Sequence, residues 1–397
     1  MPTGEARESK EGTAHEPWGQ RDRPVRRVAH VVVGMPPGGK ERVLMHLSTA
    51  LVAHGIETTV ICLTDKGTFG ECLSADGIPV VALHSCRRWD LWAVWRLARL
   101  LCRFRPDVIN VHDQTSLRYA FLANRLGVGR PMVLSCYGLL WSERHTPSWH
   151  ERVALRDVAA VTSVCEPTAR EYAQAMAWLG EVAITGNGVP SVVKAADSGR
   201  RLRAALGLSD ERFIFLAVGG IIQEKGYEDL LAAASLLREV AGPTDWVVLV
   251  AGPQRDKDYG EMLARRLVEL GLAETVRFLG YQEDVHALYS AANAFVLSSR
   301  QEGLPTVVLE AMAVGLPVVA TDVGGVAEVL QRSGGGLLAE PANPASLAEK
   351  MGMLLRSDTL CADLGGRGAD AVRQYYSAAA MAERYLGVYR RVTGAGG

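Results

Sequence analysis

Two glutamates eight residues apart, Glu302 and Glu310, are the side chains whose spacing first suggests chemistry. They lie in the stretch 298–325, SSRQEGLPTVVLEAMAVGLPVVATDVGG, which has the pattern of a loop, a helix and a strand. Pro305 suits the first position of a helix that should run to about Val314, and the glycine that follows suits its end. We therefore expect Glu302 on the loop before the helix and Glu310 just inside the helix.

The loop and the first turn of this helix form a candidate anion site, which comprises Gly303, Leu304, Pro305 and Thr306. Unpaired backbone N–H groups at the positive end of a helix dipole can hold a phosphate. One of the two carboxylates can accept hydrogen bonds from sugar hydroxyls and the other from ribose hydroxyls. A nucleotide sugar combines these groups, so the sequence predicts such a ligand.

A second candidate phosphate loop is the run GMPPGGKE at 34–41, between a predicted strand and a predicted helix. It matches G-x-x-x-x-G-K, but Glu41 stands where a nucleotide-hydrolysing P-loop has Ser or Thr for Mg²⁺. Two prolines also remove backbone donors from the loop. This disfavours an NTPase. Gly38 and Gly39 are expected either to let the backbone approach a phosphate or sugar, or to form only a tight structural turn.

Short apolar runs rich in β-branched residues alternate with segments of helical period through most of the chain, which predicts buried parallel sheets with helices on both faces. Twelve predicted strands are too many for one ordinary doubly wound sheet. We therefore expect two Rossmann-like domains with a ligand cleft at the carboxyl ends of the strands. The predicted strands are 28–33, 58–63, 80–83, 108–111, 132–135, 160–164 and 182–185, followed by 213–218, 246–251, 276–279, 294–297 and 317–320.

The expected organisation has four parts: a disordered leader at 1–24, an N-terminal acceptor domain at 25–190, a C-terminal nucleotide-sugar domain at 191–375, and a helix at 376–393 that packs back on the first domain. The chain of 397 residues carries a net charge of −1, which argues against a nucleic-acid-binding protein. Its seven cysteines form no C-x-x-C pair and favour a reducing cytosol.

The motifs, taken in order, resemble those of a glycosyltransferase of the GT-B fold, from the large retaining family with the E-x7-E motif (glycosyltransferase family 4, glycosyl transferases group 1). The resemblance covers most of residues 28–390. It is carried by the runs GGKERVLMHLSTAL, DVINVHD, ITGNGVP, FLAVGGIIQEKG, VLVAGP, VRFLGY, SSRQEGLPTVVLEAMAVGLPVVAT and GGVAEVL. The N-terminal half is loosely similar to transferases that build bacterial exopolysaccharides or related glycans.

The resemblance implies roles for individual residues. Lys225 matches a lysine on the donor diphosphate, where a positioned cation stabilises the charge of the departing group. Glu302 matches the carboxylate near the donor sugar, and Glu310 matches the one on the ribose. Gly38 and Gly39 match the glycine loop that approaches the donor. The turns at 187–188 and 324–325 are expected to be structural.

Two departures from the family pattern bear on activity. Gly220 stands where the family usually has an arginine as the second cation on the diphosphate, and Tyr137 stands where it often has a histidine at the donor sugar. Arg144, His145 and Arg300 are candidate substitutes. The departures leave open a second hypothesis, a non-catalytic homologue that binds a nucleotide sugar as a partner or sensor.

His112 and Asp113 follow a predicted strand, so they are expected to face the cleft, with His112 a candidate for acceptor binding or proton handling. A satisfied pair at a strand end is the alternative. Asp256 and Asp258 resemble a metal-binding pair on a polar loop. However, the resemblance implies neither a metal nor a cofactor, since the nucleotide sugar is a substrate.

Residues 87–105, RRWDLWAVWRLARLLCRFR, predict a basic amphipathic helix with Trp89, Trp92 and Trp95 at every third position. Such a helix can lie on an anionic membrane surface, or it can be an ordinary helix packed on a sheet with its arginines in water. The expected acceptor is a glycan, a lipid-linked molecule or a small molecule. The expected location is the cytoplasm. If the helix lies on a membrane, the protein is expected at the inner face of the cell membrane.

Overall fold

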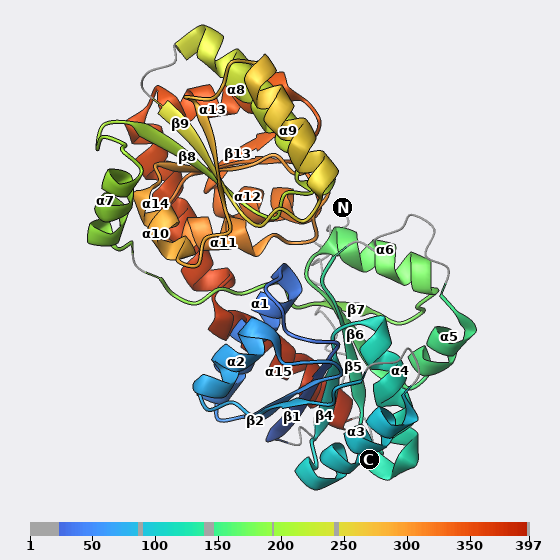
Figure 1. The fold of residues 1–397 in the computed structure, drawn as a ribbon. Helices are drawn as coiled ribbons and strands as arrows, with labels where there is room; N and C mark the ends of the chain where they lie inside the picture. The colour runs from blue at the N-terminus through green and yellow to red at the C-terminus, as the bar shows by residue number, and fades with distance from the viewer. Residues whose placement is uncertain (1–23, 86–89, 139–146, 193, 242–245, 395–397) are drawn as a thin grey trace, which may run out of the picture.

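The computed structural model describes residues 24–85, 90–138, 147–192, 194–241 and 246–394, and it has two α/β domains (Figure 1). The predicted leader at 1–24 lies almost entirely outside the described residues. In the described residues each domain is built on one sheet whose strands all run parallel. The expected GT-B architecture of two doubly wound domains is therefore confirmed.

The first sheet contains seven strands among the described residues, in the order β3-β2-β1-β4-β5-β6-β7. Crossovers on both sides of β1 put the switch in strand order between β1 and β4. The strands are β1 Arg27–Val32, β2 Glu57–Cys62, β3 Val80–Ala82, β4 Val108–Val111, β5 Met132–Cys136, β6 Val158–Ser163 and β7 Val182–Ile184. The helical elements are α1 Gly39–Ala53, α2 Gly67–Ala75, α3 Leu91–Phe104, α4 Gln114–Ala123, η1 Asn124–Val128, α5 Trp149–Leu155 and α6 Glu166–Met176.

The second sheet has six strands in the described residues, in the order β10-β9-β8-β11-β12-β13. The strands are β8 Phe213–Val218, β9 Trp246–Ala251, β10 Val276–Gly280, β11 Ala294–Leu297, β12 Val318–Thr321 and β13 Gly336–Ala339. The helical elements of this domain are α7 Ala196–Ala205, η2 Gln223–Lys225, α8 Tyr227–Ala241, α9 Lys257–Glu269, α10 Val285–Ala291, α11 Thr306–Ala313, α12 Val326–Ser333, α13 Pro344–Leu355 and α14 Asp358–Tyr375, and α15 Ala378–Gly394 follows them.

The edge strand β13 is missing from the sequence-based prediction. It contains only Gly336, Leu337, Leu338 and Ala339, and it follows two further glycines, which are typical of a turn. Four residues of this composition do not indicate a strand by themselves, and hydrogen bonding to β12 stabilises the extended conformation. The strand extends the sheet beyond the predicted five strands of this domain.

Helices cover both faces of each sheet. On the first sheet, α3, α4, α5 and α6 contribute buried side chains to one face, while α1, α2 and α15 cover the other. On the second sheet, α8, α9 and α13 pack on one face and α10, α11, α12 and α14 on the other (Figure 1). The strands therefore read as continuous apolar runs because neither face of a central strand meets water.

The chain crosses between the domains twice, and the two crossings are bound to each other. Val189 donates its N–H to the carbonyl of Tyr376 at 2.9 Å, and Ala378 donates to the carbonyl of Val189 at 2.8 Å. A Cβ atom at Gly188 would lie 2.6 Å from the carbonyl oxygen of Ser377, so only glycine fits there. This close approach supports the structural role expected for Gly188.

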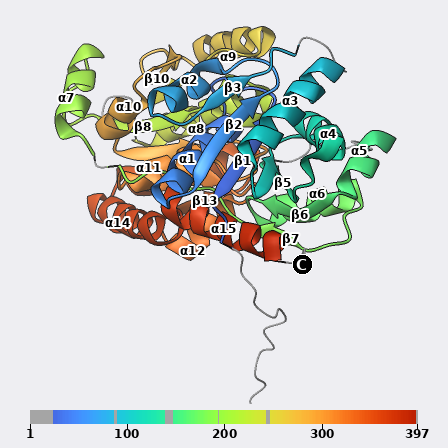
Figure 2. The ribbon, with the colours of Figure 1, turned by 90° about the horizontal axis from the view of Figure 1, so that it is seen from below.

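The last helix, α15, returns to the first domain and lies beside α1 (Figure 2). Its fully buried Tyr389 accepts a 2.8 Å hydrogen bond from Nδ2 of Asn110 on β4. Tyr385 and Thr162 both lie within hydrogen-bond distance of the Ser135 hydroxyl, which in turn donates to Asn110 Oδ1 at 2.9 Å. A chain of buried polar groups thus ties α15 to three neighbouring strands.

We expect Tyr389→Phe to lower the free energy of unfolding by about 1–3 kcal/mol, because the buried Asn110 amide loses its partner while little apolar contact is lost. Urea denaturation followed by tryptophan fluorescence measures this loss. Tyr375→Phe is the matched control, since Tyr375 is 37% exposed. Equal midpoints for the two variants would contradict the role assigned to the polar chain.

Candidate functional site

The predicted donor residues gather where the carboxyl ends of β8 and β11 meet. Lys225 ends the turn η2, and Glu302 lies on the loop after β11. The Lys225 Nζ atom lies 2.5 Å from Glu302 Oε1, which also accepts from the Ser299 hydroxyl at 2.7 Å. A second hydroxyl, that of Ser298, donates to the Lys225 carbonyl at 2.9 Å. Backbone and side chain of Lys225 are therefore held in place before any ligand binds.

The loop after Glu302 is packed between two other backbone segments. A Cβ atom at Gly303 would lie 2.3 Å from the carbonyl oxygen of Tyr137, which belongs to the other domain. Gly324 has a φ of +56°, and a Cβ there would lie 2.2 Å from the carbonyl oxygen of Glu302. Glycine at 324 is thus required both by its conformation and by its contact, as expected for a structural turn.

The helix after this loop starts one residue later than predicted. Pro305 is the N-cap of α11, with extended backbone angles, and the helix begins at Thr306. Proline fits there because its fixed φ also suits the N-cap position. In the first turn of α11 the Val308 N–H donates to the Pro305 carbonyl at 3.2 Å, and the carbonyl of the preceding Leu304 accepts from Asn187 Nδ2 at 2.6 Å.

Glu310 is bound on both of its carboxylate oxygens. Oε1 lies 3.0 Å from Nη1 of Arg42 on α1, and Oε2 accepts from the Tyr289 hydroxyl at 2.9 Å. Only 7% of Glu310 is exposed. The Arg42 contact links the two domains, and the sequence analysis missed it because nothing in the spacing of GGKERV indicates a partner 268 residues away.

The glycine loop opposite begins α1, with Gly38 as its N-cap. A Cβ at Gly38 would collide with the Glu41 carboxylate, whereas a Cβ at Gly39 would meet open space. Gly39 is thus the position at which a ligand can approach the backbone. Lys40 lies 3.4 Å from both Glu41 and Asp113, so its charge is shared with two carboxylates, unlike that of a P-loop lysine.

The position of His112 differs from the prediction. Only 2% of it is exposed, because its Nε2 lies 2.9 Å from Nδ1 of His30 and its Nδ1 lies 2.6 Å from the Tyr137 hydroxyl. Burial lowers the pKa of His112 well below its usual value, and the neighbouring His30 lowers it further; burial alone lowers the pKa of His30 to about 3. His112 is therefore a neutral residue behind Tyr137, and the expectation that it faces the cleft is wrong.

Three further expectations are corrected or remain open. Asp113 caps α4 by accepting from the Ser116 N–H at 2.7 Å. Asp256 does not lie on a long loop but at the start of α9. It caps this helix by accepting from the Tyr259 N–H at 3.0 Å, and Asp258 is in the first turn of the same helix. Arg144 and His145 lie outside the described residues.

Arg300 is not free to replace the missing arginine at position 220. Its Nε and Nη2 donate to the two carboxylate oxygens of Asp229 at 2.8 and 2.9 Å, and its Nη1 lies 2.6 Å from Glu228. A bidentate pair of this kind fixes the guanidinium plane on its partner. Arg300 therefore fastens the loop after β11 to the start of α8.

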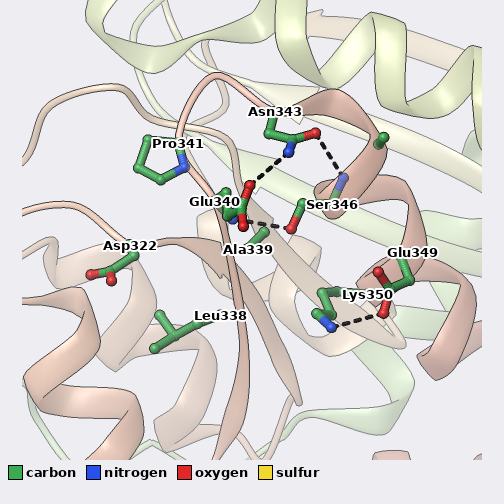
Figure 3. Close-up of a pocket in the computed structure, with 10 residues that line it drawn as sticks. Asp322, Leu338, Ala339, Glu340, Pro341, Asn343, Ser346, Glu349 and Lys350 are labelled. Atoms are coloured by element: carbon green, nitrogen blue, oxygen red, sulfur yellow. Dashed lines mark hydrogen bonds and ion pairs between the residues drawn. The ribbon is translucent and has the colours of Figure 1, made fainter.

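A pocket of about 550 Å³ lies at the ends of β12 and β13 (Figure 3). Its polar side chains bind one another: Asn343 Nδ2 donates to Glu340 at 2.7 Å, and Lys350 lies 2.9 Å from Glu349. None of the predicted donor residues lines it. We therefore place the candidate site at β8 and β11, opposite the glycine loop.

Comparison with known proteins identifies the family of the chain. Residues 37–191 match the family described as Glycosyltransferase Family 4, and residues 198–370 match Glycosyl transferases group 1. The chain is 30% identical over 335 residues to the alpha-maltose-1-phosphate synthase of Mycolicibacterium smegmatis, covering 81% of each chain. It is 25% identical to the lipopolysaccharide core glycosyltransferase LpsD of Rhizobium meliloti over 92% of this chain and 98% of that one.

Solved structures share the fold at lower identity. HepE of Anabaena, in complex with UDP and glucose, superposes with a TM-score of 0.78 at 22% identity, covering 91% of this chain and 99% of that one. WaaG, a glycosyltransferase of lipopolysaccharide biosynthesis, gives a TM-score of 0.68 at 16% identity, covering 93% and 100%. The chain therefore belongs to the glycosyltransferases that combine a Glycosyltransferase Family 4 half with a Glycosyl transferases group 1 half, and it has the GT-B fold.

Proposed function

We propose that this glycosyltransferase moves a hexose from a nucleoside diphosphate sugar to an acceptor, with retention of the anomeric configuration and without a metal ion. The observation that carries the proposal is the Lys225–Glu302 pair beside the start of α11 and across from the glycine loop. A leaving diphosphate gains negative charge as the glycosidic bond breaks, and a preplaced ammonium stabilises that charge. Lys225 then shares its charge between Glu302 and the diphosphate.

Retention is what the resemblance to the retaining E-x7-E family implies, and the contacts of the two glutamates bear only on the chemical route. Glu302 binds Lys225 and Ser299, and Glu310 binds Arg42 and Tyr289. Carboxylates held by cations and hydroxyls suit ligand binding better than nucleophilic attack, so the double-displacement route of glycosidases is disfavoured. The acceptor would attack the face from which the diphosphate leaves.

The donor is proposed from the relatives. The HepE structures contain UDP, UDP with glucose, or UDP-glucose, so UDP sugars are the first donors to test. The LpsD relative acts in lipopolysaccharide core biosynthesis, and two other relatives are an alpha-maltose-1-phosphate synthase and an alpha-D-kanosaminyltransferase, so a bacterial glycan, a glycolipid and a small molecule are all acceptors to test. In this proposal the donor binds the C-terminal domain, and the acceptor binds the N-terminal domain at the cytoplasmic face of the membrane.

The helix α3 supplies the surface for that location. Its buried stripe of Ala93, Val94, Leu97, Ala98 and Leu101 packs on the first sheet, which is the ordinary role weighed for this segment. Its outer face still carries Leu91, Trp92 and Trp95, with exposed fractions of 73%, 72% and 44%. The Arg99 guanidinium lies 4.7 Å from the Trp95 ring.

Exposed tryptophans with adjacent arginines suit the boundary between headgroups and acyl chains of an anionic bilayer. Trp89 lies outside the described residues. No helix in the described part of the chain is long and apolar enough to cross a membrane. We therefore propose contact with the membrane surface through α3, and a lipid-linked acceptor.

A non-catalytic binder of nucleotide sugars is the second candidate function. It is favoured by Gly220 and Tyr137, which depart from the family pattern at the diphosphate and at the donor sugar. The two functions differ in one measurement. A sensor binds a nucleotide sugar tightly without releasing the diphosphate, with or without an acceptor extract.

We expect the purified protein to release nucleoside diphosphate from at least one member of a nucleotide-sugar panel, and Lys225→Ala to slow that release about 100-fold or more, as when a charge-stabilising donor is lost. A coupled assay for the diphosphate measures it. Lys350→Ala is the matched control, because that lysine pairs with Glu349 in a pocket that none of the predicted donor residues lines. Tight binding without turnover of any donor would favour the sensor.

Glu310→Gln should weaken nucleoside diphosphate binding about 10-fold or more, because ribose hydroxyls lose a charged acceptor. Isothermal titration gives the dissociation constant. Glu340→Gln, in the separate pocket, changes the same charge and should have no effect. An unchanged affinity in Glu310→Gln would remove the ribose assignment and leave Glu310 as the partner of Arg42 alone.

Flotation with anionic vesicles tests the membrane surface. The wild-type protein should float with the vesicles at low salt, and Trp92→Ser/Trp95→Ser should remain in the dense fraction, because the aromatic anchors are lost. Trp149→Ser is the control, since Trp149 is 69% exposed on a different helix. Failure of the wild-type protein to float at low salt, or equal flotation of all variants, would exclude α3 as the contact surface.

A further inference from the structure

Arg255 is a cation of the cleft that no sequence motif indicated. It lies on the short segment between β9 and α9, and its side chain is exposed. Its Nη2 donates to the carbonyl oxygen of Pro37 at 2.7 Å, across the cleft and 218 residues away along the chain. Arg255 therefore touches the glycine loop from the opposite domain.

The charge of Arg255 has no carboxylate partner in the described part of the chain. Other basic side chains around the site do have one: Lys225 pairs with Glu302, Arg42 with Glu310, Arg300 with Asp229 and Lys40 with Asp113. A carbonyl oxygen satisfies one N–H of a guanidinium but does not neutralise it. Arg255 thus leaves positive charge and most of its donors available to an anion.

The side chain of Arg255 occupies the space that the missing arginine would use. A Cβ at Gly220 would lie 3.2 Å from Arg255 Cδ and 3.5 Å from its Nε. On the neighbouring residue, a Cβ at Gly219 would lie 3.3 Å from Lys225 Cε. Lys225 and Arg255 therefore flank the Gly219–Gly220 turn, one on each side, where β8 ends.

The backbone that carries Arg255 is held rigidly against this turn. Gly219 donates to the Ala251 carbonyl at 2.9 Å, and Ile221 donates to the Pro253 carbonyl at 2.9 Å. Asp256 donates back to the Ile221 carbonyl at 3.2 Å. These bonds continue the pairing of β8 and β9 beyond the strands, so the position of Arg255 relative to Lys225 is set before a ligand arrives.

We propose that Arg255 binds the diphosphate of the donor as the second cation beside Lys225, and that Gly220 is present because a side chain there would displace Arg255. This inference rests on the proposed function. A guanidinium presents a fork of N–H donors that matches phosphate oxygens. With Nη2 on Pro37, the same group also joins the glycine loop to the diphosphate when the cleft is closed.

The test is equilibrium binding of UDP, with ADP and GDP in parallel, to the full-length protein by isothermal titration. Arg255→Ala should weaken binding about 10-fold to 100-fold, as for loss of a hydrogen bond to a charged group. Arg265→Ala, which removes the same charge from the exposed part of α9, should bind as the wild type does. Thermal unfolding of each variant verifies that it is folded.

Two further variants separate charge from position. Arg255→Gln retains an N–H for Pro37 but not the charge, so it should be as weak as Arg255→Ala. Gly220→Arg/Arg255→Ala should recover affinity, because the vacated space then accepts an arginine from position 220. Gly220→Arg alone should give no gain, since the two side chains compete for the same space.

The outcomes distinguish this inference from the function on which it rests. If the wild-type protein binds none of the three diphosphates, the proposed function and the role of Arg255 both fail. If the wild-type protein binds and Arg255→Ala or Arg255→Gln binds equally well, only the role of Arg255 is overturned. A loss of the same size in Arg265→Ala would also overturn it, because net charge would then explain the effect.

Discussion

A backbone-to-backbone contact at Gly303 sets the distance between the two domains. The loop after Glu302 passes so close to the carbonyl of Tyr137 that no side chain fits at position 303. At this separation Arg42 reaches Glu310 and Arg255 reaches Pro37, each from one domain to the other. A site divided between two domains requires a rigid contact of this kind, because flexible side chains alone do not fix the distance between the domains.

The paired charges between the two domains are suited to reversible binding of an anion. Lys225 and Arg42 are neutralised by Glu302 and Glu310, so the protein itself leaves no unpaired buried charge at those positions. A diphosphate and a ribose can take over parts of these pairs. Arg42 with Glu310 and Arg255 with Pro37 are among the polar contacts that join the two domains, while backbone hydrogen bonds join the two crossings at Val189 and Tyr376.

The sequence predicted a site residue correctly where that residue lies on the loop that directly follows a buried strand. The carboxyl ends of buried strands are visible as apolar runs, and from them Lys225 and Glu302 could be expected at one edge of a sheet. Arg42 and Arg255 were not predictable in this way, because each acts on a residue of the other domain. His112 was placed at the correct strand end, yet its environment depends on His30 from a neighbouring strand, and periodicity does not reveal a polar contact inside a core.

The same reasoning changes the meaning of the two departures from the family pattern. In the sequence, Gly220 replaces the expected arginine, and the loss of that cation favours an inactive homologue. In three dimensions the side chain of Arg255, from the segment after β9, fills the space beside Gly220, so a positive charge is present at the end of β8 although position 220 does not supply it. Tyr137 is different, because its hydroxyl is bound to His112 and its carbonyl lies against Gly303. Tyr137 therefore contributes to the shape of the cleft. More generally, the effect of a substitution at one motif position depends on which residues occupy the space around it.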